Sequence, residues 1–188
     1  MPAGTNIQDF GEFRELMSTP EPPELGPGPR SGVLALDALN EKLDTFLARH
    51  ALSPAVHQPI RSAVLLWHDH LDASHHLSQD LHTPDGSFLH GIMHRREPDY
   101  GNAKYWFHRV GPHPVFSELA QKATALFDSK GDKALQTELV PGGNWDPFSF
   151  VDACEKVSRR SSQPRTDLLR SIQALEFDLL LARFIQQS

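Results

Sequence analysis

The sequence predicts an all-α fold, a single bundle-like domain of six or seven helices with a tail rich in proline and glycine at its N-terminus. Three observations support this prediction. Apolar residues recur at three- and four-residue steps along most of the chain, as they do on one face of a helix. No stretch alternates with period two for long enough to indicate a strand, and proline, glycine and capping residues separate the periodic segments. We therefore expect a flexible tail over residues 1–31 and an all-helical domain over residues 32–188.

The tail contains one segment, residues 18–32, that reads STPEPPELGPGPRSG and has almost no apolar side chain to bury. Such a composition is typical of an extended linker. Before it, Phe10, Phe13, Leu16 and Met17 have helical spacing. They predict a short helical turn that can dock on the domain.

The domain is predicted to begin with two helices, one over residues 33–51 and one from Pro54 or Pro59 to about Leu81. Ser53 before Pro54 has the form of an N-cap followed by a proline at the first helical position. A polar stripe borders the apolar face of the second helix and comprises His68, Asp72, His75 and Gln79.

Two shorter helices follow, over residues 88–97 and 102–110. A proline ends the first, and a glycine followed by a proline ends the second. The capping candidates are Ser87 or Asp85 for the first helix and Asp99 or Asn102 for the second.

The remaining predicted helices span residues 114–129, 147–157 and 164–186, with a short turn over 133–139. The last helix is apolar around much of its circumference, so we expect it to be the central helix. Glu176 lies within it and, if buried, requires a partner. Arg95, Lys104 or a metal ion could be that partner.

The composition narrows the class of protein. The net charge of −6 argues against nucleic-acid binding, and no apolar run reaches the roughly 18 residues of a membrane span. The N-terminus lacks the pattern of a signal peptide, and Cys154 is the single cysteine. We therefore expect a soluble, cytoplasmic protein without a disulfide. The unusual feature is histidine, because nine of the 11 fall between Trp67 and Pro114.

Two predicted helices carry histidines and carboxylates one turn apart, a spacing that allows them to share one metal ion. The candidate metal ligands are His90, His94 and Glu97 on the helix over 88–97, and His68, Asp72 and His75 on the helix before it. Mixed nitrogen and oxygen ligands suit zinc, iron or manganese. Such an ion would activate water or polarise a substrate oxygen, so the protein can be a metal-dependent enzyme, hydrolytic or oxidative.

Cationic side chains in the same region also predict a site for an anionic small molecule. The candidate substrate-binding residues are Arg95, Arg96, Asn102, Lys104 and Arg109. The candidate catalytic residues are His90 and His94, as acid or base, together with Arg95, Lys104 and Tyr105.

The alternative is a non-enzymatic helical scaffold or protein-interaction module. In that interpretation Arg95 and Arg96 pair with Glu97, Asp99 and Asp72 to lock two helices together, because buried arginines are normally paired. The histidines would then be a structural polar network, and the function would lie in a protein interface.

Residues 89–116 read LHGIMHRREPDYGNAKYWFHRVGPHPVF. This run resembles the signature of an uncharacterised family of small helical proteins, with the histidine pair, REPD, NAKYW and VGxHPV in the same order. The resemblance covers roughly one sixth of the chain. It implies no activity. It implies that one shared feature comprises His90, His94, Arg95, Glu97, Asp99, Asn102, Lys104, Tyr105, Trp106 and His113.

Overall fold

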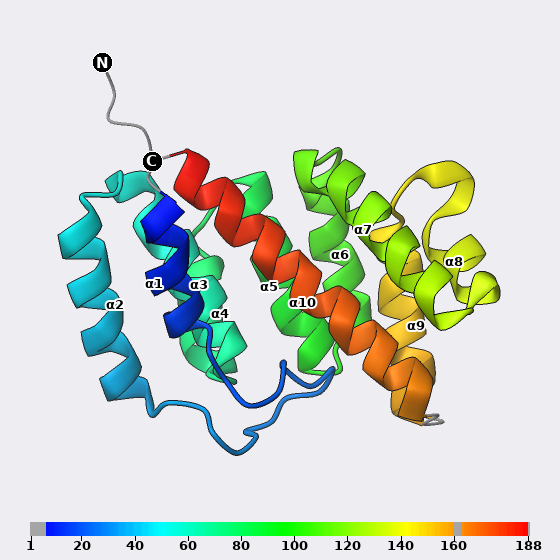
Figure 1. The fold of residues 1–188 in the computed structure, drawn as a ribbon, viewed down its shortest axis with the longest axis horizontal. Coiled ribbons are helices and arrows are strands. Elements are labelled where there is room, and N and C mark those ends of the chain that lie inside the picture. The colour runs from blue at the N-terminus through cyan, green and yellow to red at the C-terminus, as the bar shows by residue number, and fades with distance from the viewer. Residues whose placement is uncertain (1–6, 160–162, 188) are drawn as a thin grey trace.

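The computed structural model describes residues 7–159 and 163–187, and this part of the chain contains helices and no strands, as the periodicity predicts (Figure 1). The α-helices in chain order are α1 (Ile7–Leu16), α2 (Leu36–His50), α3 (Pro54–Trp67), α4 (Leu71–Ser78), α5 (Pro84–Arg96), α6 (Tyr100–Val110), α7 (Pro114–Lys130), α8 (Lys133–Leu139), α9 (Pro147–Arg159) and α10 (Gln163–Gln186). A 3₁₀ turn, η1 (Pro141–Gly143), lies between α8 and α9.

The ten α-helices of the described residues exceed the expected six or seven. One of the extra helices, α1, forms inside the predicted tail, and another arises because the second predicted helix is divided into α3 and α4. Pro59 lies inside α3 and does not mark its start. The short α8 occupies the segment that was expected to be a turn.

The break between α3 and α4 lies at His68, Asp69 and His70. Asp69 has a left-handed backbone, with φ of 65°, a conformation that aspartate tolerates better than most residues. Its carboxylate accepts hydrogen bonds from the main-chain N–H of Arg30 at 2.9 Å and from Nη2 of Arg96 at 2.6 Å. These long-range contacts hold the break, so His68 lies at the C-terminal end of α3 and His75 lies on α4.

The long helix α10 crosses the molecule and packs against α3, α7 and α9 (Figure 1). Its apolar side chains, including Phe177, Leu180 and Phe184, are buried. It is the central helix that its sequence predicts.

The segment from residue 17 to 35 runs from the end of α1 along the lower side of the molecule and back to α2 (Figure 1). Polar side chains of α5 and α10 bind its main-chain carbonyls: Arg170 donates to Pro22 at 2.7 Å, Gln173 to Pro23 at 3.2 Å and Arg96 to Glu24 at 3.1 Å. We call residues 17–35 the strap. The sequence predicts a flexible linker here, whereas the structure shows a segment held at several points.

The helix before the strap also packs on the body, since Phe13 and Leu16 of α1 belong to the hydrophobic core. Residues 1–6 and the side chain of Phe10 lie outside the described part of the chain. The predicted docking of this segment on the domain is therefore observed through Phe13 and Leu16.

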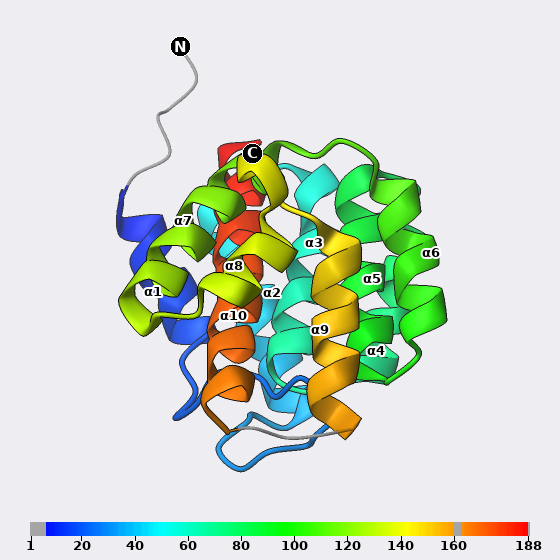
Figure 2. The same cartoon turned by 90° about the vertical axis from the view of Figure 1, so that its right-hand side faces the viewer.

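Helices α5 and α6 form a close pair that shares one side of the molecule with α4 (Figure 2). Thr83 caps α5 by accepting from the N–H of Gly86, in place of the expected Ser87 or Asp85, and Asp99 caps α6. Gly91 permits the close approach, because a Cβ there would lie 2.9 Å from the ring of Phe107. This packing brings the polar face of α5 against α6.

No helix in the described ranges is both long enough and apolar enough to cross a membrane.

Candidate metal centre

Three histidines from two helices meet between α4 and α5. His75 lies on α4, and His90 and His94 lie one turn apart on α5. One ring nitrogen of each lies within 4.8 Å of the others. We call these three residues the histidine cluster. It combines one member of the first predicted ligand set with two members of the second.

The rings of the cluster are held by stacking. His90 lies parallel to Trp106 of α6, with ring centroids 3.8 Å apart and planes at 14°, and parallel to His94 at 4.7 Å. His75 meets both rings edge-on, at 4.8 Å from His90 and 5.3 Å from His94. Trp106 of α6 therefore packs against the cluster. Its position in the helical pattern could not distinguish this role from ordinary core packing.

His90 is the most unusual member of the cluster. Its side chain is buried, with 2% of the residue exposed, and neither Nδ1 nor Nε2 has a hydrogen-bond partner among the described residues. Buried polar atoms are normally paired, because an unpaired one loses its hydration without compensation. Burial, with a smaller contribution from the neighbouring His94 and His75, lowers the pKa of His90 to about 3. The ring is therefore neutral near pH 7, with a nitrogen lone pair free to bind.

His94 is buried as well but has two polar neighbours. Its Nδ1 lies 3.1 Å from Oε2 of Glu97, and its Nε2 lies 3.0 Å from Nδ2 of Asn102. Burial lowers the pKa of His94 despite the opposing effect of Glu97. A neutral His94 that donates from Nδ1 to Glu97 has its lone pair on Nε2.

Glu97 itself is half exposed and contacts His94 without joining the group of three converging atoms. A carboxylate in this position orients a histidine and strengthens it as a ligand. Asp99 is the second carboxylate whose charge favours a positive charge at His94. These two carboxylates therefore favour a positive charge beside His94, against the effect of burial.

Two predicted metal ligands lie outside the cluster. His68 donates from Nε2 to the carbonyl of Leu16, the last residue of α1, at 2.8 Å and accepts at Nδ1 from the N–H of Leu34 in the strap at 3.1 Å, so both of its nitrogens have partners. Asp72 is exposed on the first turn of α4. One continuous helix would have placed His68 and His75 on the same face. The break at residues 68–70 separates them.

Arg95 is buried in the core between α5 and α10. Its Nη1 donates to Oε1 of Glu176 at 3.1 Å, and its Nη2 donates to the other oxygen of Glu176 and to Oε1 of Gln173 at 3.2 Å. The guanidinium also lies over the ring of Phe150, at 4.3 Å from its centroid. Arg95 is thus the partner that a buried Glu176 requires.

Arg96 is buried too, and it holds Asp69, the carbonyl of Leu66 and the strap. The partners of Arg95 and Arg96 are therefore not the expected Glu97, Asp99 and Asp72. Both guanidiniums are engaged in the protein interior, away from any incoming anion.

The predicted polar residues of α6 are divided. Asn102 contacts His94, whereas Lys104 pairs with Asp152 of α9 at 2.5 Å. Tyr105 is 53% exposed. Arg109 lies over the ring of Trp106, at 5.2 Å from its centroid.

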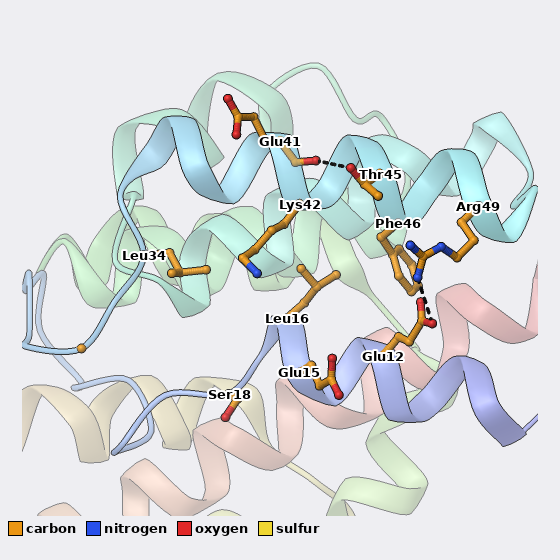
Figure 3. A pocket seen from close by; sticks show the side chains of 11 residues that line it. Glu12, Glu15, Leu16, Ser18, Leu34, Glu41, Lys42, Thr45, Phe46 and Arg49 are labelled. Atoms are coloured by element: carbon orange, nitrogen blue, oxygen red, sulfur yellow. Dashed lines mark hydrogen bonds and ion pairs between the residues drawn. The ribbon is translucent and has the colours of Figure 1, made fainter.

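A hollow of about 520 Å³ lies elsewhere, between α1 and α2 (Figure 3). Charged side chains of both signs line it, among them Glu12, Glu15, Lys42 and Arg49. None of the predicted site residues lines this hollow.

Comparison with protein-family models, curated proteins and solved structures finds no match to this chain. The resemblance of residues 89–116 to a family of helical proteins therefore stays a prediction.

Proposed function

We propose that the histidine cluster binds a divalent transition-metal ion, with zinc as the first choice and iron or manganese as alternatives. The observation that carries this proposal is His90, whose two buried nitrogens have no hydrogen-bond partner in the described structure and which lies beside two other imidazoles, those of His75 and His94. A metal ion supplies the missing partner. Neutral imidazole nitrogen is a preferred ligand of zinc, copper and iron.

Binding requires a modest adjustment of the rings. Ligand nitrogens around tetrahedral zinc lie about 3.3 Å apart, since each zinc–nitrogen bond is about 2.0 Å. The three nitrogens of the cluster lie up to 4.8 Å apart. Rotation of the side chains, His75 above all because it is only partly buried, can close this difference without moving a helix.

Three protein ligands leave one position of a tetrahedral ion for water, the arrangement of catalytic zinc sites. A metal in such a site lowers the pKa of the bound water and can serve hydrolysis. Glu97 would hold His94 in orientation from its far nitrogen. We propose metal-dependent hydrolysis as the activity, in a cytoplasmic protein, as its single cysteine suggests.

The second candidate function is a scaffold without a metal. The pairing of Arg95 with Glu176, of Arg96 with Asp69 and of His68 with Leu34 of the strap supports it, because each is a structural polar contact. The same pairing weakens the proposal of a site for an anionic small molecule. Only His90 lacks such a partner among the histidines and arginines of α5.

The test is a zinc titration of protein purified without an affinity tag, together with elemental analysis. The variant is His90→Phe, which keeps an aromatic ring against Trp106 and removes both nitrogens. The matched control is His76→Ala, since His76 adjoins His75 but binds the carbonyl of Asp72 and lies outside the cluster. We expect about one zinc per chain in the wild type and in the control.

We expect His90→Phe to weaken zinc binding by more than about 100-fold, because even residues that only support a ligand contribute 10- to 100-fold. A wild-type protein that binds neither zinc, iron nor manganese would exclude the metal and favour the scaffold. Equal binding by the wild type and His90→Phe would place the metal elsewhere.

A further inference from the structure

We propose that His68 is a pH-sensitive latch, which holds α1 and the C-terminal part of the strap on the body while its ring is neutral and releases them when the ring is protonated. His68 follows α3 directly, and only 1% of the residue is exposed. It lies outside the histidine cluster, so this inference does not depend on a bound metal.

The two ring nitrogens of His68 have neighbours of opposite polarity. A main-chain N–H can only donate, so the contact of Leu34 with Nδ1 at 3.1 Å requires a lone pair on Nδ1. A carbonyl oxygen can only accept, so the contact of Leu16 with Nε2 at 2.8 Å requires a proton on Nε2. The neutral ring with its proton on Nε2 satisfies both. A second proton would place an N–H of the ring against the N–H of Leu34 and break that hydrogen bond.

The surroundings of His68 disfavour its protonated form. Burial lowers the pKa of His68 most, and Arg30 of the strap and the neighbouring His70 lower it further, while the carbonyl of Leu16 raises it. Asp69 also favours the charged ring, but its carboxylate is already paired with Arg30 and with Arg96 of α5. A released and hydrated ring should have a pKa near 6.5. As the pH falls below this value, the released state binds a proton that the latched state excludes, so acid favours release.

The latch joins two segments that depend on contacts with the body. Leu16 is the last residue of α1, and Leu34 lies in the strap just before α2. Helix α1 has ten residues, too few to be stable alone in water. Its Phe13 meets Phe46 of α2 edge-on at 4.7 Å, and Leu16 and Leu34 line the hollow between these helices (Figure 3). Release therefore opens the hollow and exposes Phe13 and Phe46.

Other contacts of the strap and of α1 respond differently to acid. Arginine and glutamine side chains of α5 and α10 hold the middle of the strap, and these side chains do not titrate near neutral pH. His50 of α2 lies 2.6 Å from Oε2 of Glu12 on α1, and a proton on His50 strengthens this contact. This effect opposes release, so the test has to separate His68 from His50.

The experiment is hydrogen exchange measured by mass spectrometry on the full-length protein with a chelator present, at several pH values and expressed as protection factors. The variant is His68→Gln, whose amide does not titrate and offers both an acceptor and a donor. The matched control is His57→Gln, the same change on α3 at a histidine that contacts the carbonyl of Leu52. Peptides from α1 and from residues 30–36 report release, and peptides from α10 report unfolding of the whole protein.

Between pH 7.5 and pH 5.5 we expect α1 and residues 30–36 of the wild type to lose several-fold to about tenfold in protection, tenfold being the limit for one histidine with a released pKa near 6.5. The control should show the same loss. His68→Gln should show none, because the group that titrates is gone, and His50 remains in place. Peptides from α10 should lose less protection than those from α1.

An equal loss in His68→Gln would assign the release to another group and overturn the latch. A wild type without the loss, or with a loss at α10 as large as that at α1, would overturn it too, since the segments then stay closed or open only with the whole protein. If His68→Gln does not fold at pH 7.5, His68→Asn replaces it, because its amide oxygen can still accept from Leu34. The comparison of α1 with α10 needs only the wild type and can overturn the latch by itself.

Discussion

His90 shows how burial sets the protonation state of a single residue. Its ring lies between Trp106 and His94 and has no hydrogen-bond partner among the described residues, and its pKa is lowered to about 3. The unfolded chain should have a histidine pKa near 6.5. Between these two values the unfolded state binds a proton that the folded state does not.

The metal-free protein should therefore lose stability as the pH falls below about 6.5, because the unfolded state gains protons first. His90 alone should account for at most about 3 kcal/mol of this loss at pH 4. The lowered pKa values of His68 and His94 act in the same direction. Urea unfolding of the wild type and His90→Phe, with a chelator present, should show a smaller loss in the variant. Parallel pH dependences would show that His90 titrates normally.

Single residues were predicted in part. The spacing of His90 and His94 on one helix identified them as neighbours. Cys154 is buried, and burial raises the pKa of its thiol to about 12, so it stays protonated. His75 lies beside His90 and His94 because α4 packs on α5. The spacing of residues along one helix cannot predict a contact between two helices.

At the scale of elements, the contact between Arg95 and Glu176 connects α5 to α10. Both side chains are fully buried, and each charge is compensated by the other. Burial raises the pKa of Glu176 while Arg95 opposes that rise. The two residues are 81 positions apart in the sequence. Helical periodicity therefore predicted Arg95 only as one of several candidate partners for Glu176.

Glu176→Gln should destabilise the protein by about 3–5 kcal/mol, because it leaves the Arg95 charge buried without its counterion. The double variant Arg95→Met with Glu176→Leu should recover much of this loss, since it removes both charges and keeps apolar volume. Chemical denaturation measures both free energies of unfolding. A loss below about 1 kcal/mol for Glu176→Gln would mean that water reaches the pair.

Helix boundaries were predictable where a local signal sets them. The Asp146-Pro147 start of α9 and the proline and glycine that bound α7 lie where the sequence predicts them. The break between α3 and α4 was not predictable, because Asp69 is held there by Arg30 and Arg96 from distant segments.

At the scale of the whole molecule, the all-helical class and the central helix α10 followed from periodicity, whereas the path of the strap did not. Its proline-rich sequence offers carbonyl groups and few apolar side chains, and its contacts come from Arg96, Arg170 and Gln173 on other helices. Such contacts to main-chain carbonyls leave no pattern in the sequence of the strap itself. The interior is therefore built on apolar packing with buried polar contacts that fix the strap, α5 and α10 together.

The central claim is that His75, His90 and His94 bind one metal ion, and X-ray absorption spectroscopy of the zinc-loaded protein tests it most directly. We predict three imidazole nitrogens at about 2.0–2.1 Å from zinc and no sulfur ligand. The spectrum of His90→Phe, loaded at higher zinc concentration, should show one imidazole fewer. Fewer than three imidazoles in the wild type, or a sulfur atom at about 2.3 Å that would come from Cys154, would contradict the account.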